Sequence, residues 1–240
     1  MASNRSDIGR RTVLRGTGAA MLTGTLAGCS DILSLGSTGA NDNVVLDLPE
    51  EYDQRSEADL PYPIHGEELP AATAPAPLHD REVSTREFVG DRHVMLTGIF
   101  TRCSEVCPRL VEPLVQAQAA SIKDEFADEF AFLPITFDPE YDTPEQITEY
   151  SEERGADLDI GNWWFLRPES RQRAEEVTDT FGVLSEFVPE DDREMENMAW
   201  VHNNVVILAN ADGYVERTYT REPPNPATAL EDVETLRERW

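Results

Sequence analysis

Two cysteines four positions apart are the residues of this sequence best suited to chemistry. Cys103 and Cys107 are separated by Ser-Glu-Val and followed by Pro108. Thiols at this spacing can face the same side of a helix entrance, where the helix dipole favours thiolate over thiol. The pair therefore predicts a metal or redox site. A structural disulfide is the alternative, although it would close only a short loop.

A histidine could complete a metal site, because two thiolates alone do not fill three or four coordination positions. Two thiolates and an imidazole can hold copper in either oxidation state. We expect His65, His79 and His93 to be solvated, since they lie in or near a linker or just before a strand. His202 differs because an apolar strand follows it, and it is the candidate ligand. A lone histidine at such a position is otherwise more often structural.

The elements that must position these residues alternate between strands and helices. The apolar run 94–100 predicts a strand before the cysteines, and apolar residues at four-residue spacing over 106–122 predict a helix after them. The run 130–137 is again typical of a strand. The three elements form a βαβ unit, whose strands should be parallel. Pro113 should kink the helix or delay its regular part.

The rest of the chain predicts an antiparallel hairpin and further helices. The expected elements are a helix from 142 to 154, a short strand at 163–166, a helix from 168 to 181, a hairpin of 201–209 with 213–219, and a helix from 226 to 240. A parallel unit followed by a hairpin favours a thioredoxin-like α/β sandwich, with a central mixed sheet flanked by helices. Other small α/β sheets would also fit. We expect Trp163, Trp164 and Trp200 to fill the core.

The N-terminal region is typical of an export signal. Arg10 and Arg11 precede an apolar, small-residue run over 16–28, which resembles a twin-arginine signal. Leu-Ala-Gly-Cys, ending at Cys29, resembles a lipobox, and the apolar run is too short for an ordinary membrane span. We therefore expect a signal peptide over 1–29 and lipidation of Cys29. The alternative is a thiol in an uncleaved segment.

Amino-acid composition predicts two regions after the expected signal peptide, a tether and a folded domain. Residues 30–76 are rich in Ser, Gly, Asp, Glu and Pro, which predicts a flexible tether before a domain over 77–240. The chain has 47 acidic and 20 basic residues, and its formal net charge is −27. Nucleic acid is excluded as a partner, because phosphate binding needs basic groups. The acids alternate with apolar residues along the chain, which indicates an acidic solvated surface on a folded domain.

Three motifs of this sequence resemble the Sco/SenC family. The segment Phe-Thr-Arg-Cys-Ser-Glu-Val-Cys-Pro at 100–108 is similar to the strand, Cys-x-x-x-Cys-Pro and helix entry of that family. The segment 135–144 resembles its Asp-Pro-x-x-Asp-Thr-Pro, and 202–213 its histidine, strand and Asp-Gly turn. In this order the motifs span most of residues 78–240.

The resemblance implies that Cys103, Cys107 and His202 are copper ligands. It also implies that Asp138 lies near the site without being a ligand, although a turn or cap role fits Asp138 equally well. The family often has Asp directly before the ligand histidine, where this chain has Val201. A carboxylate that could orient the imidazole is therefore missing.

The resemblance further implies a metallochaperone. Its function would be delivery of copper to the dinuclear copper centre of a respiratory terminal oxidase, from a lipid anchor on the outer face of the cell membrane. A thiol-disulfide oxidoreductase that uses Cys103 and Cys107 to reduce the oxidase's copper-binding cysteines is the alternative. The usual Cys-x-x-Cys of general thiol oxidoreductases is absent, and no proline lies just before Val201. A copper-free adaptor that keeps only the fold is a third alternative.

Overall fold

The computed structural model describes residues 43–193 and 199–240. The expected signal peptide, Cys29 and the first part of the expected tether lie outside these residues. None of the helices in the described ranges is long and apolar enough to cross a membrane.

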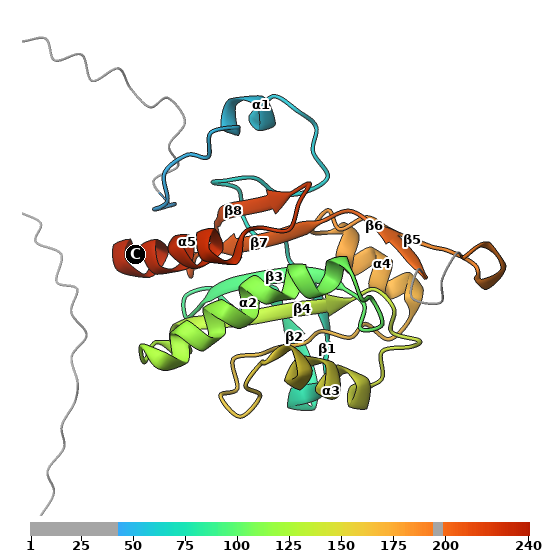
Figure 1. Cartoon of the computed structure of the whole chain (residues 1–240). Coiled ribbons are helices and arrows are strands. Elements are labelled where there is room, and N and C mark those ends of the chain that lie inside the picture. The colour runs from blue at the N-terminus through green and yellow to red at the C-terminus, as the bar shows by residue number, and fades with distance from the viewer. Residues whose placement is uncertain (1–42, 194–198) are drawn as a thin grey trace, which may run out of the picture. The chain divides into compact units, whose positions relative to one another are not determined.

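A four-stranded mixed sheet forms the centre of the described chain (Figure 1). Its strands are β3 (His93–Ile99), β4 (Phe130–Thr136), β7 (Val205–Ala209) and β8 (Val215–Thr220), in the order β4-β3-β7-β8. β3 and β4 are parallel, whereas β7 is antiparallel to both β3 and β8. This arrangement confirms the predicted βαβ unit, the hairpin and the thioredoxin-like fold class.

Within the described ranges, five α-helices accompany the sheet. They are α1 (Tyr52–Ser56), α2 (Val106–Lys123), α3 (Pro144–Arg154), α4 (Arg171–Asp179) and α5 (Pro226–Arg239), with short 3-10 turns at Pro77–His79, Thr85–Phe88, Ala127–Glu129 and Glu190–Asp192. α2 connects β3 to β4, packs on both strands and lies beside α5. Pro113 lies inside α2 and is buried, so the expected shift of the regular helix is not observed.

The expected strand over 201–209 is two strands in the structure. β6 (Trp200–His202) pairs with β5 (Ser185–Phe187) in a separate two-stranded sheet, and β7 begins only at Val205. The Asn203 side chain explains the break, because it accepts a hydrogen bond from Leu184 N and donates one to the Gly182 carbonyl. His202 therefore lies on β6 and not on the central sheet. The expected strand 163–166 makes only two isolated parallel bridges to β4.

The part of the expected tether after residue 42 packs against the domain. Glu216 is fully buried, and its carboxylate accepts hydrogen bonds from the backbone N–H groups of Val45 and Leu46. β1 (Thr73–Ala76) pairs with β2 (Arg81–Ser84) in an antiparallel sheet. The expectation that His65 is solvated is wrong, because this packing buries it with Nδ1 2.9 Å from the Glu216 carbonyl oxygen.

The core confirms the expected burial of the tryptophans. Trp163, Trp164 and Trp200 are all buried, and β3 and β4 are buried along their whole length. Gly98 lies in β3 where a Cβ atom would meet Val183 Cγ1 at 2.6 Å, so glycine permits this close approach.

Candidate metal centre

The structure brings Cys103, Cys107 and His202 together at one end of the central sheet. Cys103 lies in the loop after β3, Cys107 lies in the first turn of α2, and His202 ends β6. One donor atom from each residue lies within 4.8 Å of the other two. The Nε2 atom of His202 is 3.7 Å from Cys107 Sγ, and both thiols are free. Two sulfurs and one imidazole nitrogen thus converge on a space that a metal ion could occupy.

A backbone carbonyl orients the His202 imidazole. Its Nδ1 lies 2.9 Å from the carbonyl oxygen of Asn203, which can only accept a hydrogen bond. Nδ1 must therefore carry the proton, and the Nε2 lone pair is free to bind a metal. The rings of Phe100 and Phe137 pack around the imidazole, with centroids 6.2 Å and 5.0 Å away. The carboxylate that is missing at Val201 is thus not needed to fix the ring.

The two thiols have unequal environments. A hydrogen bond from the Cys107 thiol, with further ones from backbone N–H groups, lowers the pKa of Cys103 well below its ordinary value. The Cys107 N–H donates to Cys103 Sγ at 3.4 Å, as expected at a helix entrance. Burial raises the pKa of Cys107, whose side chain is fully enclosed. Cys103 is therefore the thiolate that reaches the surface, and Cys107 is the protected thiol beneath it.

Asp138 is buried, and its carboxylate pairs with the guanidinium of Arg102. Its carboxylate forms a 2.6 Å ion pair with Arg102, whose guanidinium also lies 4.4 Å from the centroid of the Tyr141 ring. Asp138 is not part of the group of three donors. Its contact is thus with the neighbour of Cys103, and it anchors the loop that carries this cysteine.

Asp142 is a buried residue that the sequence placed at the start of a helix and in the motif at 135–144, with no role predicted at the centre. Its carboxylate accepts hydrogen bonds from the N–H and hydroxyl of Thr101 and a very short one from the Thr136 hydroxyl. Burial raises the pKa of Asp142 to about 6. The contact joins the strand-end loop of β4 to the segment two residues before Cys103. The only sequence signal for this contact is the Asp-Thr-Pro motif, which is also common at the start of an ordinary helix.

The other histidines lie away from the centre. His79 Nε2 lies 2.9 Å from the Trp163 carbonyl oxygen, and its ring stacks on Trp164. His93 is buried, contrary to expectation, and its Nδ1 accepts a hydrogen bond from the Ala211 N–H. Within residues 43–193 and 199–240, no second group of three metal-binding side chains occurs.

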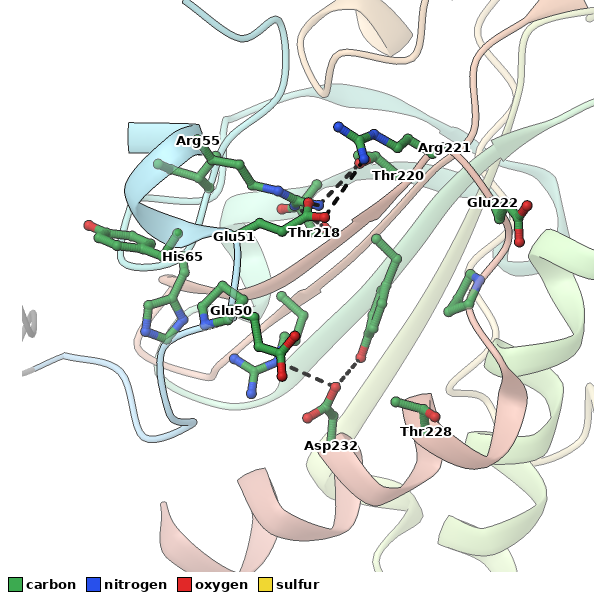
Figure 2. Close-up of a pocket in the computed structure, with 16 residues that line it drawn as sticks. Glu50, Glu51, Arg55, His65, Thr218, Thr220, Arg221, Glu222, Thr228 and Asp232 are labelled. Atoms are coloured by element: carbon green, nitrogen blue, oxygen red, sulfur yellow. Dashed lines mark hydrogen bonds and ion pairs between the residues drawn. The ribbon is translucent and has the colours of Figure 1, made fainter. Parts of the chain in front are cut away.

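A pocket of about 420 Å³ lies between α1, β8 and α5, and several of its charged side chains form ion pairs with one another (Figure 2). Glu51 forms ion pairs with Arg55 at 3.1 Å and with Arg221 at 3.7 Å. Asp232 lies 3.4 Å from Arg217 and accepts a hydrogen bond from a tyrosine hydroxyl. Among the described residues, no group of three metal-binding side chains lies in this pocket.

Comparison with known proteins assigns the family. The sequence profile described as SCO1/SenC matches residues 78–238, which include all three donors of the metal centre. The chain belongs to the SCO1/SenC family. A search of curated proteins found no match.

Solved structures of this family share the fold. A SCO1/SenC family lipoprotein from Bacillus anthracis is 20% identical, with a TM-score of 0.56 over 71% of this chain and 95% of that chain. BsSco, described as a member of the Sco family of cytochrome c oxidase assembly proteins with a disulfide switch, is 22% identical, with a TM-score of 0.55 over 72% and 95%. ScoI of Bradyrhizobium japonicum with copper bound is 19% identical, with a TM-score of 0.53 over 72% and 99%.

Proposed function

We propose that this protein is a copper metallochaperone that delivers copper to the dinuclear copper centre of a respiratory terminal oxidase. The observation that carries the proposal is the convergence of Cys103, Cys107 and His202 within 4.8 Å. Two thiolates and an imidazole suit copper in either oxidation state, and soft sulfur favours Cu(I). The copper-bound state of ScoI and the assembly role named for BsSco support the same function.

Delivery requires that the ion can leave. Three protein ligands leave a coordination position open, so a donor from the partner can bind before a protein ligand dissociates. Cys103 is partly exposed and Cys107 is fully buried, so exchange begins at the exposed side of the centre. In this process copper changes ligands, and neither protein needs to be oxidised or reduced.

The proposal places the protein on the outer face of the cell membrane. A twin-arginine signal over residues 1–29 and lipidation of Cys29 would export the chain and anchor it. Labelling with a radioactive fatty acid in the source organism tests the anchor. The parent should carry label in the membrane fraction, and a Cys29→Ser variant should carry none.

An anaerobic Cu(I) titration of the reduced protein against a competing chelator tests the centre. We expect one tightly held ion in the parent, loss of tight binding in Cys103→Ser and Cys107→Ser, and at least about ten-fold weaker binding in His202→Ala. His79→Asn is the matched control, because His79 lies outside the group, and it should bind copper like the parent. Equal binding by all variants would contradict the assignment of the ligands.

Reduction of a partner disulfide is a second candidate function. Two neighbouring thiols of unequal character favour it. Cys103 is partly exposed and has a lowered pKa, whereas Cys107 is buried and has a raised pKa. The Cys103 thiolate would attack the partner disulfide and release one partner thiolate, which takes up a proton. Cys107 would then lose its proton and displace the second partner thiol, so that this protein ends oxidised and the partner reduced by two electrons. Rapid reduction of a disulfide peptide together with no Cu(I) binding would favour this function over copper delivery.

A further inference from the structure

A pocket of about 230 Å³ lies directly beside the candidate metal centre. It is lined by Phe100, Cys103, Ser104, Glu105, Val106, Trp200, Val201 and His202. Two of the three donors thus lie on its wall, while Cys107 is completely buried. A donor atom from another molecule would reach a bound ion through this pocket.

The walls of the pocket are mainly apolar and partly aromatic. Among the described residues that line the pocket, Glu105 is the single ionisable one apart from the two donors, although 28% of the chain is charged. Val201 is 64% exposed, and Leu184, which hydrogen-bonds the segment after His202, is 48% exposed. The indole nitrogen of Trp200 is buried and has no hydrogen-bond partner among the described residues. The described walls of the pocket therefore present mainly apolar surface to an entering group.

We propose that this pocket receives a methionine side chain of the protein that exchanges copper with the centre. The inference rests on the proposed copper function and specifies the partner at the same site. A thioether is apolar and uncharged, it packs favourably against aromatic rings, and its sulfur is a weak hydrogen-bond acceptor. It is also a soft ligand for Cu(I). Its lone pair forms the new copper bond, and no proton or electron is transferred.

Other copper ligands fit the pocket less well. A thiolate would bring a further negative charge into apolar surroundings beside Cys103, where desolvation penalises it. An imidazole would bring an N–H group into mainly apolar surroundings, where a donor left without a partner is costly. The uncharged sulfur of methionine avoids both costs.

The test compares two short peptides that differ in one side-chain group, a sulfur atom against a methylene group. One carries methionine between glycine and alanine residues, and the other carries norleucine, which keeps the apolar shape and lacks sulfur. Binding to the Cu(I)-loaded and the metal-free protein is followed by the NMR signal of the Trp200 indole, and X-ray absorption reports the sulfur atoms around copper. A Val201→Asp variant alters the wall, and Ile160→Asp alters another exposed apolar residue outside the pocket.

We expect the methionine peptide to bind the copper-loaded protein about ten-fold more tightly than the norleucine peptide, and the two to bind the metal-free protein equally. Copper should gain one sulfur neighbour. Val201→Asp should weaken binding of the methionine peptide at least about five-fold, and Ile160→Asp should leave its affinity unchanged.

Three results would overturn the inference. Cu(I) binding in the chelator titration with equal affinity for both peptides would overturn it while leaving the copper function intact. Absence of Cu(I) binding would overturn the copper function and the inference with it. The chain also has methionines at 195 and 198, outside the described residues. Loss of a copper–sulfur contact in a Met195→Leu, Met198→Leu variant without peptide would assign the pocket to the chain itself.

Discussion

Protonation of His93 is expected to destabilise the fold below neutral pH. His93 is 2% exposed, and its Nδ1 accepts a hydrogen bond from the Ala211 N–H at 3.0 Å. The ring also packs against Phe130 and Trp240, with centroids 4.8 Å and 5.0 Å away. A proton on Nδ1 would remove the acceptor and place a charge in this enclosure. Burial accordingly lowers the pKa of His93 from 6.5 to about 4, partly offset by the charge of Asp212.

The size of the effect follows from this difference in pKa. The folded state binds the proton less tightly than the unfolded state, so the stabilisation by neutral His93 is complete above pH 6.5 and declines as the pH falls towards 4. Linkage gives a loss in the free energy of unfolding of about 2 kcal/mol at pH 5 and about 3 kcal/mol at pH 4. Losses of this size are a large fraction of the stability of an ordinary domain.

Urea unfolding of the parent and of His93→Asn at pH 7.5 and pH 5 measures this loss. The asparagine Oδ1 can accept the Ala211 N–H and does not titrate, so the variant should lose about 2 kcal/mol less than the parent between the two pH values. The comparison cancels contributions from other groups, including the opposite one from Asp142. Equal losses in parent and variant would refute the reasoning, and so would an NMR titration showing His93 with an ordinary pKa.

Three further predictions concern the centre and the core. Burial raises the pKa of Asp142 from 3.8 to about 6, so the protonated carboxyl stabilises the fold fully below pH 3.8 and this stabilisation is lost as the pH rises through 6. Between pH 3.5 and pH 7.5, the free energy of unfolding of Asp142→Asn should therefore rise by about 3 kcal/mol relative to that of the parent in urea unfolding. The absence of such a relative gain would contradict this. Thiolate absorbance should show Cys103 ionising well below the ordinary pKa of a thiol, and Cys107→Ala should raise that pKa by removing the largest cause of the shift; an unchanged titration would argue against the hydrogen bond. Gly98→Ala should cost about 1–3 kcal/mol by overpacking, measured by urea unfolding, and a Val183→Ala background should relieve much of this cost.

The fold could largely be predicted from the sequence because its elements have strong local signals. The apolar runs before and after the first helix are fully buried strands, and such runs are recognisable without any tertiary information. The strand break at Asn203 could not be predicted in this way, because it depends on contacts with Leu184 and Gly182, about twenty residues earlier. The burial of His65 likewise depends on packing of the N-terminal segment against Glu216, which composition alone does not reveal.

The residues of the candidate metal centre could be selected from the sequence by type, but the contacts that support them could not. Cys103 and Cys107 have a recognisable spacing, but His202 is 95 positions from Cys107 and no local pattern links the two. The contact of Asp142 with Thr101 joins positions 41 apart, and only the fold brings them together. Local spacing identifies candidate ligands, whereas the residues that hold them in place come from distant parts of the chain.

Val201, directly before His202, has two linked consequences at the candidate centre. A carboxylate before His202 could orient the imidazole and would add a negative charge beside two thiols. The Asn203 carbonyl orients the ring without that charge, because its oxygen lies 2.9 Å from Nδ1. At position 201, the largely exposed apolar side chain of Val201 lies on the wall of the adjoining pocket. The orientation of the candidate ligand therefore does not depend on residue 201, and the proposed donor would pass an apolar side chain at that position instead of a carboxylate.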